Sequence, residues 1–305
     1  MQRILEPGQI EALAAREVPR LRLPDRARLF AARAERLRQL SRGHALAGYL
    51  DLLASVAVAQ HAALEHLEVT LPDDAQRTAA RTHRMPLIPA LGWPRSPAWR
   101  AVLGSLLSAL AAGAFPPAVT AACARLSAAS IGQLEAEADR LLAADARVED
   151  PAAAPLVMSA LQVYWVALAA RLAPEEVGLP ESSGVCPVCG SLPVASVVRT
   201  GAPYAGYRYL HCGLCATEWH RVRAECTHCN AVAGVAYHSI EGKSAAIRAE
   251  SCDSCRSYRK IFYQEHDPEV DPVADDIGSV ALDLLLTEAG FHRASGNPLL
   301  WQSPG

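Results

Sequence analysis

The chain lacks the sequence features of a secreted or membrane-spanning protein. Residues 1–17 contain neither the apolar stretch of a signal peptide nor a twin arginine. No run of 18 uninterrupted apolar residues occurs, and the most apolar segment, residues 46–67, is interrupted by Asp51, Gln60 and His61. We therefore expect a soluble, cytoplasmic protein without membrane insertion, in a compartment where thiols stay reduced.

Motifs of catalysis are also missing. The chain has no G-x-S-x-G nucleophile elbow and no G-x-G-x-x-G dinucleotide-binding loop. His61 and His66 do not have the spacing of a zincin, and Tyr237 stands where the phosphate-binding loop that Gly242-Lys243-Ser244 suggests would need a glycine. We therefore predict that the protein is not an enzyme.

An excess of positive charge is missing as well. The formal net charge is −3, and aromatic residues make up only 6% of the chain. Nucleic-acid-binding surfaces combine clustered basic residues with aromatic side chains that stack on bases, so no nucleic acid is expected as a partner. A homo-oligomer is compatible with this composition.

Four cysteine pairs with C-x2-C spacing are the dominant feature of the sequence. They read Cys186-Pro-Val-Cys189, Cys212-Gly-Leu-Cys215, Cys226-Thr-His-Cys229 and Cys252-Asp-Ser-Cys255. In each half of the stretch 22 residues separate the two pairs, and a shift of 40 residues carries every cysteine of the first half onto one of the second. The stretch is therefore a tandem repeat, with copies at about residues 184–224 and 225–264.

Paired C-x2-C turns are typical of metal sites. Two such turns facing each other place four sulfurs at the corners of a tetrahedron, which suits Zn²⁺ or mononuclear iron. Four disulfides are the alternative, which the spacing and the lack of a secretory signal disfavour. Gly190 and Asn230 follow the second cysteine of their turns and are expected to have a positive φ. We predict two mononuclear metal ions, zinc or iron, held by Cys186, Cys189, Cys212, Cys215, Cys226, Cys229, Cys252 and Cys255.

The spacing allows two ways of sharing the metal ions. Sequential pairing joins the first pair with the second and the third with the fourth, whereas cross-braced pairing joins the first with the third and the second with the fourth. The repeat favours sequential pairing, because each copy then closes its own site.

The composition changes near residue 181, and this change predicts the domains. Residues 1–180 are expected to form an all-α helical domain, with an apolar Pro- and Gly-containing loop at residues 85–94 packed on its surface. Residues 181–305 are expected to form the metal domain, with strands beside the cysteine turns and a last helix over residues 271–290. The fold class is therefore α+β and multidomain. Helices of the first domain are predicted at residues 23–40, 46–67, 99–110, 117–128, 130–145 and 154–172.

Several polar residues of the metal domain have alternative interpretations. His211, His220 and His228 lie beside the cysteines, and we expect them to support the sites or lie at the surface, since eight cysteines already satisfy two metal ions. Asp275-Asp276 is interpreted as a partner of the helix dipole, with an exposed acidic binding site as the alternative. Basic residues are interpreted as compensation for thiolate charge, with an anionic partner such as RNA as the alternative; they are Arg199, Arg208, Arg221, Arg223, Arg248, Arg256, Arg259 and Lys260.

The cysteine turns belong to longer motifs that together cover roughly residues 184–290. These motifs are Cys186-Pro-Val-Cys189-Gly-Ser-Leu-Pro, Tyr209-Leu-His-Cys-Gly-Leu-Cys215, Thr217-Glu-Trp-His220 with Arg223 and Cys226, Glu250-Ser-Cys-Asp-Ser-Cys255, Tyr258-Arg-Lys260, Asp275-Asp276 and Leu282-Asp283. Through them the sequence resembles the formate dehydrogenase accessory protein family, FdhE. The helical half is similar more loosely, through Met85-Pro86-Leu87 and the segment from Trp93 to Trp99.

This resemblance implies a role that spacing alone does not show. Members of the family are cytoplasmic factors needed for active respiratory formate dehydrogenase, they bind its catalytic subunit before export, and no enzymatic reaction is assigned to them. The resemblance also implies that the eight cysteines are metal ligands in a tandem rubredoxin-like or zinc-ribbon-like domain, usually with iron. A rubredoxin-like electron carrier or redox sensor is the first alternative function, and a zinc-ribbon nucleic-acid-binding protein is the second.

Overall fold

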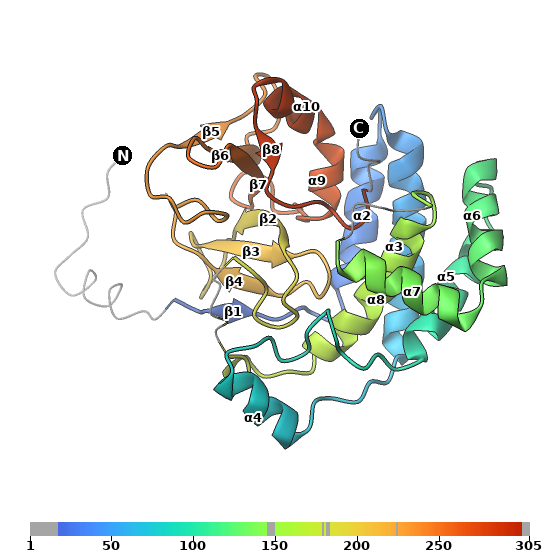
Figure 1. Cartoon of the computed structure of the whole chain (residues 1–305). Coiled ribbons are helices and arrows are strands. Elements are labelled where there is room, and N and C mark those ends of the chain that lie inside the picture. Colours follow the sequence, from blue (N-terminus) through green and yellow to red (C-terminus); the bar gives the residue numbers. More distant parts are fainter. Residues whose placement is uncertain (1–17, 145–149, 179, 181–183, 224, 301–305) are drawn as a thin grey trace.

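The computed structural model describes residues 18–144, 150–178, 180, 184–223 and 225–300. A bundle of helices lies beside a mixed β-sheet, and the last helices of the chain cover one end of that sheet (Figure 1). The expected α+β class is confirmed. Several residues at the bounds of the expected domains, repeats and helices lie outside the described residues: 1–17, 145, 181–183, 224 and 301–305.

The first half of the chain is helical, as the apolar periodicity predicts. Compared with the prediction, the first helix begins later, after Pro24, and a short helix with an Asp73–Gln76 capping box was not expected. The helices are α2 (Leu29–Ser41), α3 (Ala47–His66), α4 (Asp74–Thr82), α5 (Ala98–Ala111), α6 (Pro117–Ala128), α7 (Ile131–Leu142) and α8 (Ala154–Ala169), followed by the short 3-10 helix η1 (Pro174–Glu176).

Helices α3 and α8 form the centre of the bundle. Every residue of α8 is buried, which explains why its sequence is apolar on all sides. Among the described residues, α3 is the one helix long and apolar enough to cross a membrane, but it packs between α2, α5 and α8. Its buried Gln60 donates hydrogen bonds to the Ser159 carbonyl (2.8 Å) and to Gln162 Oε1 (3.0 Å) of α8. Gln60 is thereby paired inside the bundle, as a buried amide requires.

The apolar loop at residues 85–94 packs against the helices, as predicted, and also reaches the first cysteine turn. Trp165 Nε1 of α8 donates to the Ile88 carbonyl at 3.1 Å. On the other side of the loop, the Ile88 N–H donates to the Val188 carbonyl (2.9 Å) and the Ala90 N–H to the Cys189 carbonyl (2.7 Å). The loop therefore connects the helical bundle to the first cysteine turn through backbone hydrogen bonds.

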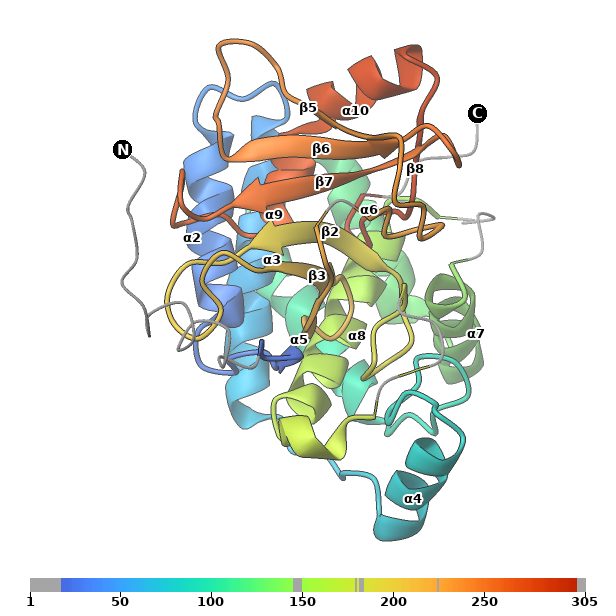
Figure 2. The ribbon, with the colours of Figure 1, turned by 90° about the vertical axis from the view of Figure 1, so that its left-hand side faces the viewer.

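The sheet is continuous across both repeats. Its order is β1-β4-β3-β2-β7-β6-β5, with β8 paired to β7, and Figure 2 shows β5, β6, β7, β2 and β3 stacked in this order in front of the helices. Each repeat contributes an antiparallel meander, and parallel pairing of β2 with β7 joins the two meanders. The strands are β1 (Leu21–Arg22), β2 (Pro193–Val198), β3 (Arg208–Cys212), β4 (Glu218–His220), β5 (Val235–His238), β6 (Ile247–Cys252), β7 (Ser257–Tyr263) and β8 (His292–Arg293).

Segments distant in sequence complete the sheet and its cover. Strand β1 precedes the helices but pairs with β4, where Leu21 lies opposite Trp219. Helix α9 (Ala274–Gly278) follows the metal repeats but packs against α2. Contacts therefore run both ways across residue 181, and the division there into two domains stays a prediction.

The prediction of one last helix over residues 271–290 is wrong. The segment forms two short helices, α9 and α10 (Val280–Glu288), which meet at Ser279 with φ −120°. The Ser279 hydroxyl donates to the Asp275 carbonyl at 2.6 Å, so the side chain takes a bond that a continuing helix would give to a backbone N–H. Gly290 ends the segment at φ +80°, as expected.

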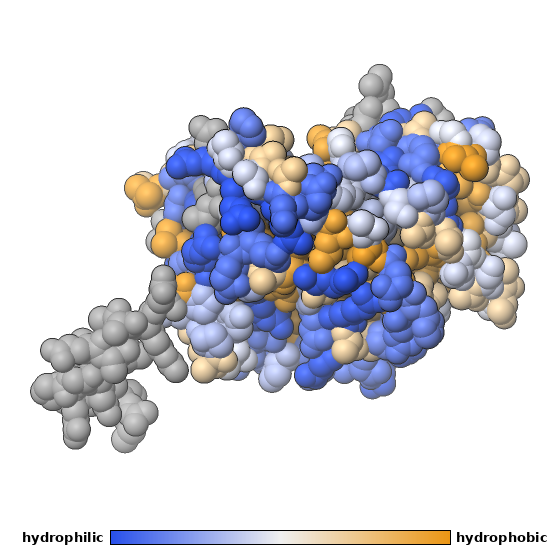
Figure 3. Space-filling view, turned by 90° about the horizontal axis from the view of Figure 1, so that it is seen from below, coloured by the Kyte–Doolittle hydropathy of each residue, from blue (hydrophilic) through white to orange (hydrophobic). Residues whose placement is uncertain are grey.

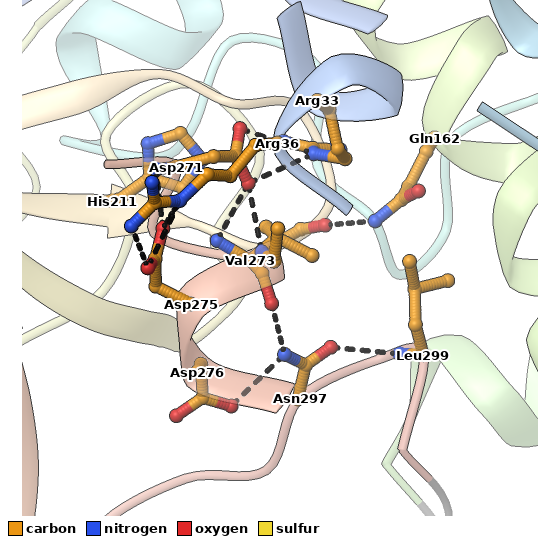
Figure 4. A network of polar contacts seen from close by, with 12 residues as sticks. Arg33, Arg36, Gln162, His211, Asp271, Val273, Asp275, Asp276, Asn297 and Leu299 are labelled. Atoms are coloured by element: carbon orange, nitrogen blue, oxygen red, sulfur yellow. Dashed lines mark hydrogen bonds and ion pairs between the residues drawn. The ribbon is translucent and has the colours of Figure 1, made fainter. Parts of the chain in front are cut away.

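Asp275 and Asp276 lie in the first turn of α9, but they are fully buried, so the alternative of an exposed acidic site is wrong. Asp275 accepts a bidentate hydrogen bond from Arg36 of α2, and Asp276 accepts from Asn297 Nδ2 at 2.9 Å and from Arg293. Figure 4 shows Arg36 of α2, Asp275 and Asp276 of α9, and Asn297 of the C-terminal segment converging. A buried carboxylate requires such pairing, and the network fixes α9 between the helical bundle and the sheet.

Candidate metal centres

The cysteine turns have the same backbone geometry in both repeats. In the first, the Cys186 N–H donates to the Ser191 carbonyl (2.9 Å) and the Gly190 N–H to the Cys186 carbonyl (2.8 Å). The matching bonds in the second repeat are Cys226 to Ala231 (2.8 Å) and Asn230 to Cys226 (3.0 Å). Gly190 (φ +77°) and Asn230 (φ +62°) both have the positive φ that closing such a turn requires, as predicted.

The eight sulfurs gather into two groups of four. Within each group the ligand atoms lie within 4.8 Å of one another. The grouping is the sequential one, not the cross-braced one. The first centre comprises Cys186, Cys189, Cys212 and Cys215, and the second comprises Cys226, Cys229, Cys252 and Cys255.

The sulfur spacing fits a tetrahedral metal ion. In the first centre Cys186 and Cys215 Sγ lie 3.5 Å apart, and in the second Cys226 and Cys255 Sγ lie 3.8 Å apart. A metal–sulfur bond of about 2.3 Å places tetrahedral ligands about 3.8 Å apart, whereas a disulfide needs about 2.05 Å. All eight cysteines are free thiols. The two groups therefore could hold metal ions, and disulfides are not formed.

Hydroxyl groups contact the last sulfur of each centre at equivalent positions. Thr217 Oγ1 lies 3.2 Å from Cys215 Sγ, and Ser257 Oγ lies 3.0 Å from Cys255 Sγ. Backbone N–H groups add to this: Leu214 donates to Cys212 Sγ at 3.4 Å. Backbone N–H donors of this kind stabilise metal-bound thiolates. The sequence interpretation missed Thr217 and Ser257, although both occupy the second position after the last cysteine and coincide under the 40-residue shift.

The crowded thiols differ in their affinity for protons. Burial raises the pKa of Cys186 and Cys215 well above the usual value. Burial acts in the same direction on Cys189, but hydrogen bonds from Cys186, Cys212 and Cys215 outweigh it and hold its pKa well below the usual value. In the second centre backbone N–H groups of Cys255 and Ser254 outweigh burial and lower the pKa of Cys252 to about 7. In each centre one cysteine, Cys189 or Cys252, therefore loses its proton more readily than an ordinary thiol. A bound cation would favour deprotonation of the other three.

The histidines beside the cysteines are not ligands in either group. His211 is buried, and its Nδ1 lies 2.9 Å from Glu218 Oε1. Burial lowers the pKa of His211 and outweighs the neighbouring Glu218 carboxylate, which acts in the opposite direction. His228 is exposed, and His220 packs edge-on against Tyr207 and Tyr209. The expected surface position is confirmed for His228, whereas His211 and His220 contact Glu218 and tyrosines rather than the cysteines.

Arg199 and Arg208 are paired with buried carboxylates rather than with thiolates. Glu218, fully buried, accepts from Arg199 Nε at 2.9 Å, and Glu250 accepts from Arg208 Nη1 at 2.6 Å. Burial would raise the pKa of Glu218, but the Arg199 guanidinium and the His211 bond hold it well below its usual range. The interpretation of these arginines as compensation for thiolate charge is therefore wrong for Arg199 and Arg208. Their role is to neutralise glutamates inside the sheet.

The two centres differ in exposure. All four cysteines of the first centre are buried, with exposed fractions of 0 to 1%. In the second, Cys229 is exposed, Cys255 is partly exposed, and Cys226 and Cys252 are buried. Equivalent cysteines thus lie in different surroundings although their turns have the same geometry.

Outside the centres, a groove of about 400 Å³ lies between α3 and α5. It is lined mainly by small apolar side chains, and His66 is its one titratable group. A reactive site would need converging polar groups, so this groove nominates no catalytic residues. The lining residues are Ala59, Ala62, Ala63, His66, Leu67, Ala98, Ala101, Val102, Ser105 and Ala109.

Comparisons with known proteins match the whole described fold. Three family models match consecutive parts of the chain: FdhE, N-terminal, at residues 18–180; FdhE, central domain, at residues 185–223; and FdhE, C-terminal domain, at residues 224–300. Among curated relatives, a "Protein FdhE homolog" of Yersinia pestis (strain Pestoides F) is 39% identical over 290 residues, covering 94% of this chain and 93% of the relative. That of Edwardsiella ictaluri (strain 93-146) is 42% identical over 284 residues, covering 92% and 91%. The crystal structure of the FdhE protein from Pseudomonas aeruginosa superposes with a TM-score of 0.84 at 39% identity, covering 94% of this chain and 100% of that chain.

Proposed function

The chain belongs to the FdhE family, and on that premise we propose that it is an accessory, chaperone-like factor in the maturation of respiratory formate dehydrogenase. It binds the catalytic subunit of that enzyme in the cytoplasm and catalyses no reaction itself. The observation that carries the proposal is the pair of sequential four-cysteine groups in a chain that matches the family from end to end of its described fold.

We propose further that the eight cysteines hold two mononuclear metal ions, one in each centre. The four sulfurs of each group have tetrahedral spacing, and the hydroxyls of Thr217 and Ser257 lie beside them. Iron is favoured through the family resemblance, and zinc is the alternative, since both accept four thiolates. The metal ion, when bound, fixes the cysteine turns and supplies either a structural link or a one-electron couple.

A domain fixed in this way suits partner binding. Cysteine turns held by a metal ion present their loops with little loss of conformational entropy on association, which favours affinity. Apolar surface is also available: Figure 3, which views the molecule from below, shows hydrophobic side chains in the middle of that face with hydrophilic ones around them. Contiguous apolar surface of this kind is typical of interaction sites.

The test is direct binding. The metal-loaded chain is immobilised, and the purified catalytic subunit of a respiratory formate dehydrogenase is titrated over it by interferometry, with an unrelated oxidoreductase of similar size as the control. Saturable binding of the formate dehydrogenase subunit alone is expected. Equal binding of both proteins, or of neither, would remove the proposed function.

An electron carrier or redox sensor is the second candidate, and the exposure of Cys229 favours it, because electron exchange needs a centre close to the surface. Elemental analysis and a visible spectrum of one anaerobic sample separate the two. Two irons per chain, with charge-transfer colour that bleaches on reduction and returns on oxidation, would support the redox function. Two colourless zinc ions would leave partner binding as the function.

A further inference from the structure

The first centre is enclosed by three segments outside its own repeat. The loop at residues 85–94 bonds to the Val188 and Cys189 carbonyls, and a Cβ at Gly190 would lie 3.1 Å from Pro86 Cγ. On the second cysteine turn, Gln162 of α8 donates to the Gly213 carbonyl at 2.6 Å. A Cβ at Gly213 would lie 2.9 Å from Pro298 Cδ, so the C-terminal segment closes this side. An incoming reagent reaches these sulfurs only after several such contacts break.

Among the described residues, other segments pack against the second centre near Thr227 and Arg256, but the centre is open to solvent at Cys229. This centre is formed by the third and fourth cysteine turns of the chain. His228, Cys229 and Asn230 are exposed in the third turn, and Asp253 and Ser254 are exposed in the fourth.

Arg259 Nε donates to the buried Thr227 Oγ1 at 3.0 Å, and Arg256, next to the fourth turn, donates to the Ala289 carbonyl at 3.1 Å and lies 4.0 Å from the centre of the Phe291 ring. The exposed side of the third turn has the surface bond from Arg221 to Asn230 Oδ1 at 3.0 Å, and Cys229 beside it is exposed.

The inner side of the second centre is nearly filled. The cavity lined by Cys226, Cys252, Glu250 and Arg259 has a volume of about 10 Å³, enough for about one water molecule. Within the part of the chain that the structure describes, the open approach for an external ligand is therefore from the solvent side, at Cys229 and Cys255.

We propose that the second centre is a metal-exchange site, which gives its metal ion to an external thiolate ligand or takes it from one, whereas the first centre keeps its ion permanently. The inference rests on the proposed metal binding by the eight cysteines. In the exchange, external thiolate sulfurs replace the four cysteine sulfurs on the metal ion one at a time, beginning at Cys229, so that each new metal–sulfur bond forms as one bond to a cysteine breaks. Each released cysteine thiolate then takes a proton from water, and no oxidation is involved. The two centres differ in how easily an external ligand reaches their sulfurs, not in the geometry of their cysteine turns. Exposed thiolates undergo ligand exchange, whereas buried thiolates are inert.

The experiment measures the release of zinc from the full chain. The chain is loaded with zinc until elemental analysis gives two ions per chain. It is then mixed with excess 4-(2-pyridylazo)resorcinol, whose zinc complex is coloured. Release in two phases is expected, with one ion per chain leaving at least about tenfold faster than the other, because the reagent reaches only one centre directly. One single phase for both ions would overturn the inference.

Thiol mapping identifies the centre without any substitution. N-ethylmaleimide is added during the fast phase, and the modified cysteines are found by mass spectrometry. Modification of the second centre, Cys229 first, with the first centre unmodified is expected. Modification of Cys186 or Cys189 in the fast phase would overturn the assignment.

Matched variants add a third measurement. Cys229→Ser is expected to remove the fast phase and leave the slow one, and Cys189→Ser, its equivalent in the first repeat, is expected to do the reverse. Should a variant fail to fold, the mapping of the unsubstituted chain still decides. A loading of the unsubstituted chain below two ions before any reagent is added would instead contradict the metal assignment itself, so the two failures are distinguishable.

Discussion

The two repeats use one local design in two different environments. Gly190 and Asn230 occupy the same position, with the same backbone conformation, but Gly190 packs against Pro86 while Asn230 is exposed and bonded to Arg221. The first repeat is held by the helical bundle and the C-terminal segment, whereas the second lies at the free end of the sheet. Equal ligand geometry therefore does not imply equal stability or reactivity, because surrounding contacts decide how easily a centre opens.

The largest effect on stability is expected from substitutions that remove one cysteine ligand from one centre at a time. Cys186→Ser should remove one metal ion and loosen the first repeat together with the loop at residues 85–94, because that loop bonds to the Val188 and Cys189 carbonyls. Cys226→Ser should loosen only the second repeat. Losing a structural metal ion removes on the order of 10 kcal/mol of binding free energy. Hydrogen exchange measured by mass spectrometry would reveal the pattern, and equal protection of residues 85–94 in both variants would contradict the difference.

A smaller effect is expected from the buried charges of the first repeat. Glu218→Gln should reduce the free energy of unfolding by about 3 kcal/mol, because it leaves Arg199 buried without its carboxylate. Glu241→Gln is the matched control, since Glu241 is exposed and should change stability by less than about 0.5 kcal/mol. Urea unfolding of both variants measures the difference. Equal stabilities would show that the Glu218 network contributes nothing net.

The same carboxylate makes stability depend on pH. Because the pKa of Glu218 is lower in the folded state than in the unfolded chain, its contribution is present above the unfolded value of about 4.3 and is lost as the pH falls towards the folded value. Asp271 and Asp276, whose pKa values are also lowered, act in the same direction. Glu218→Gln should flatten the acid side of the stability curve by up to about 1.4 kcal/mol per pH unit. Urea unfolding at a series of pH values measures this slope, and an unchanged slope would contradict the assignment.

The smallest effect on stability is expected from substitutions of Gly190 and Asn230, the residues with positive φ in the two equivalent turns. Gly190→Ala should reduce stability by about 1 to 2 kcal/mol, because alanine is strained at φ +77° and its Cβ would press on Pro86. Asn230→Gly, which relieves the same conformation in the second repeat, should leave stability unchanged or raise it by a few tenths of a kcal/mol. Thermal unfolding checks both substitutions. A loss in Asn230→Gly as large as in Gly190→Ala would show that the second turn is as constrained as the first.

Sequence reasoning succeeded where the determinants are local. The positive φ at Gly190 and Asn230 and the sequential grouping of sulfurs follow from short-range sterics and from the repeat. Helices such as α6 and α8 followed from apolar periodicity and proline positions. The break at Ser279 was missed because it depends on a side-chain bond to Asp275 that competes with the helix.

Sequence reasoning failed where partners are distant along the chain. The sequence around Leu21 does not predict that this residue lies opposite Trp219. Likewise, the sequence around Asp275 does not predict its pairing with Arg36, 239 residues away. Such pairs arise only when the helical bundle and the sheet are packed together. They also decide which carboxylates are buried.

The sequence by itself determined the two tetrahedral sulfur groups, because C-x2-C spacing and a residue tolerant of positive φ define each cysteine turn within a few bonds. Only the tertiary structure decided that the first group is enclosed and that Cys229 of the second faces solvent. The physical reason is that turn geometry depends on short-range backbone sterics. Burial depends instead on which distant surfaces, here the loop at residues 85–94, α8 and the C-terminal segment, pack over a site.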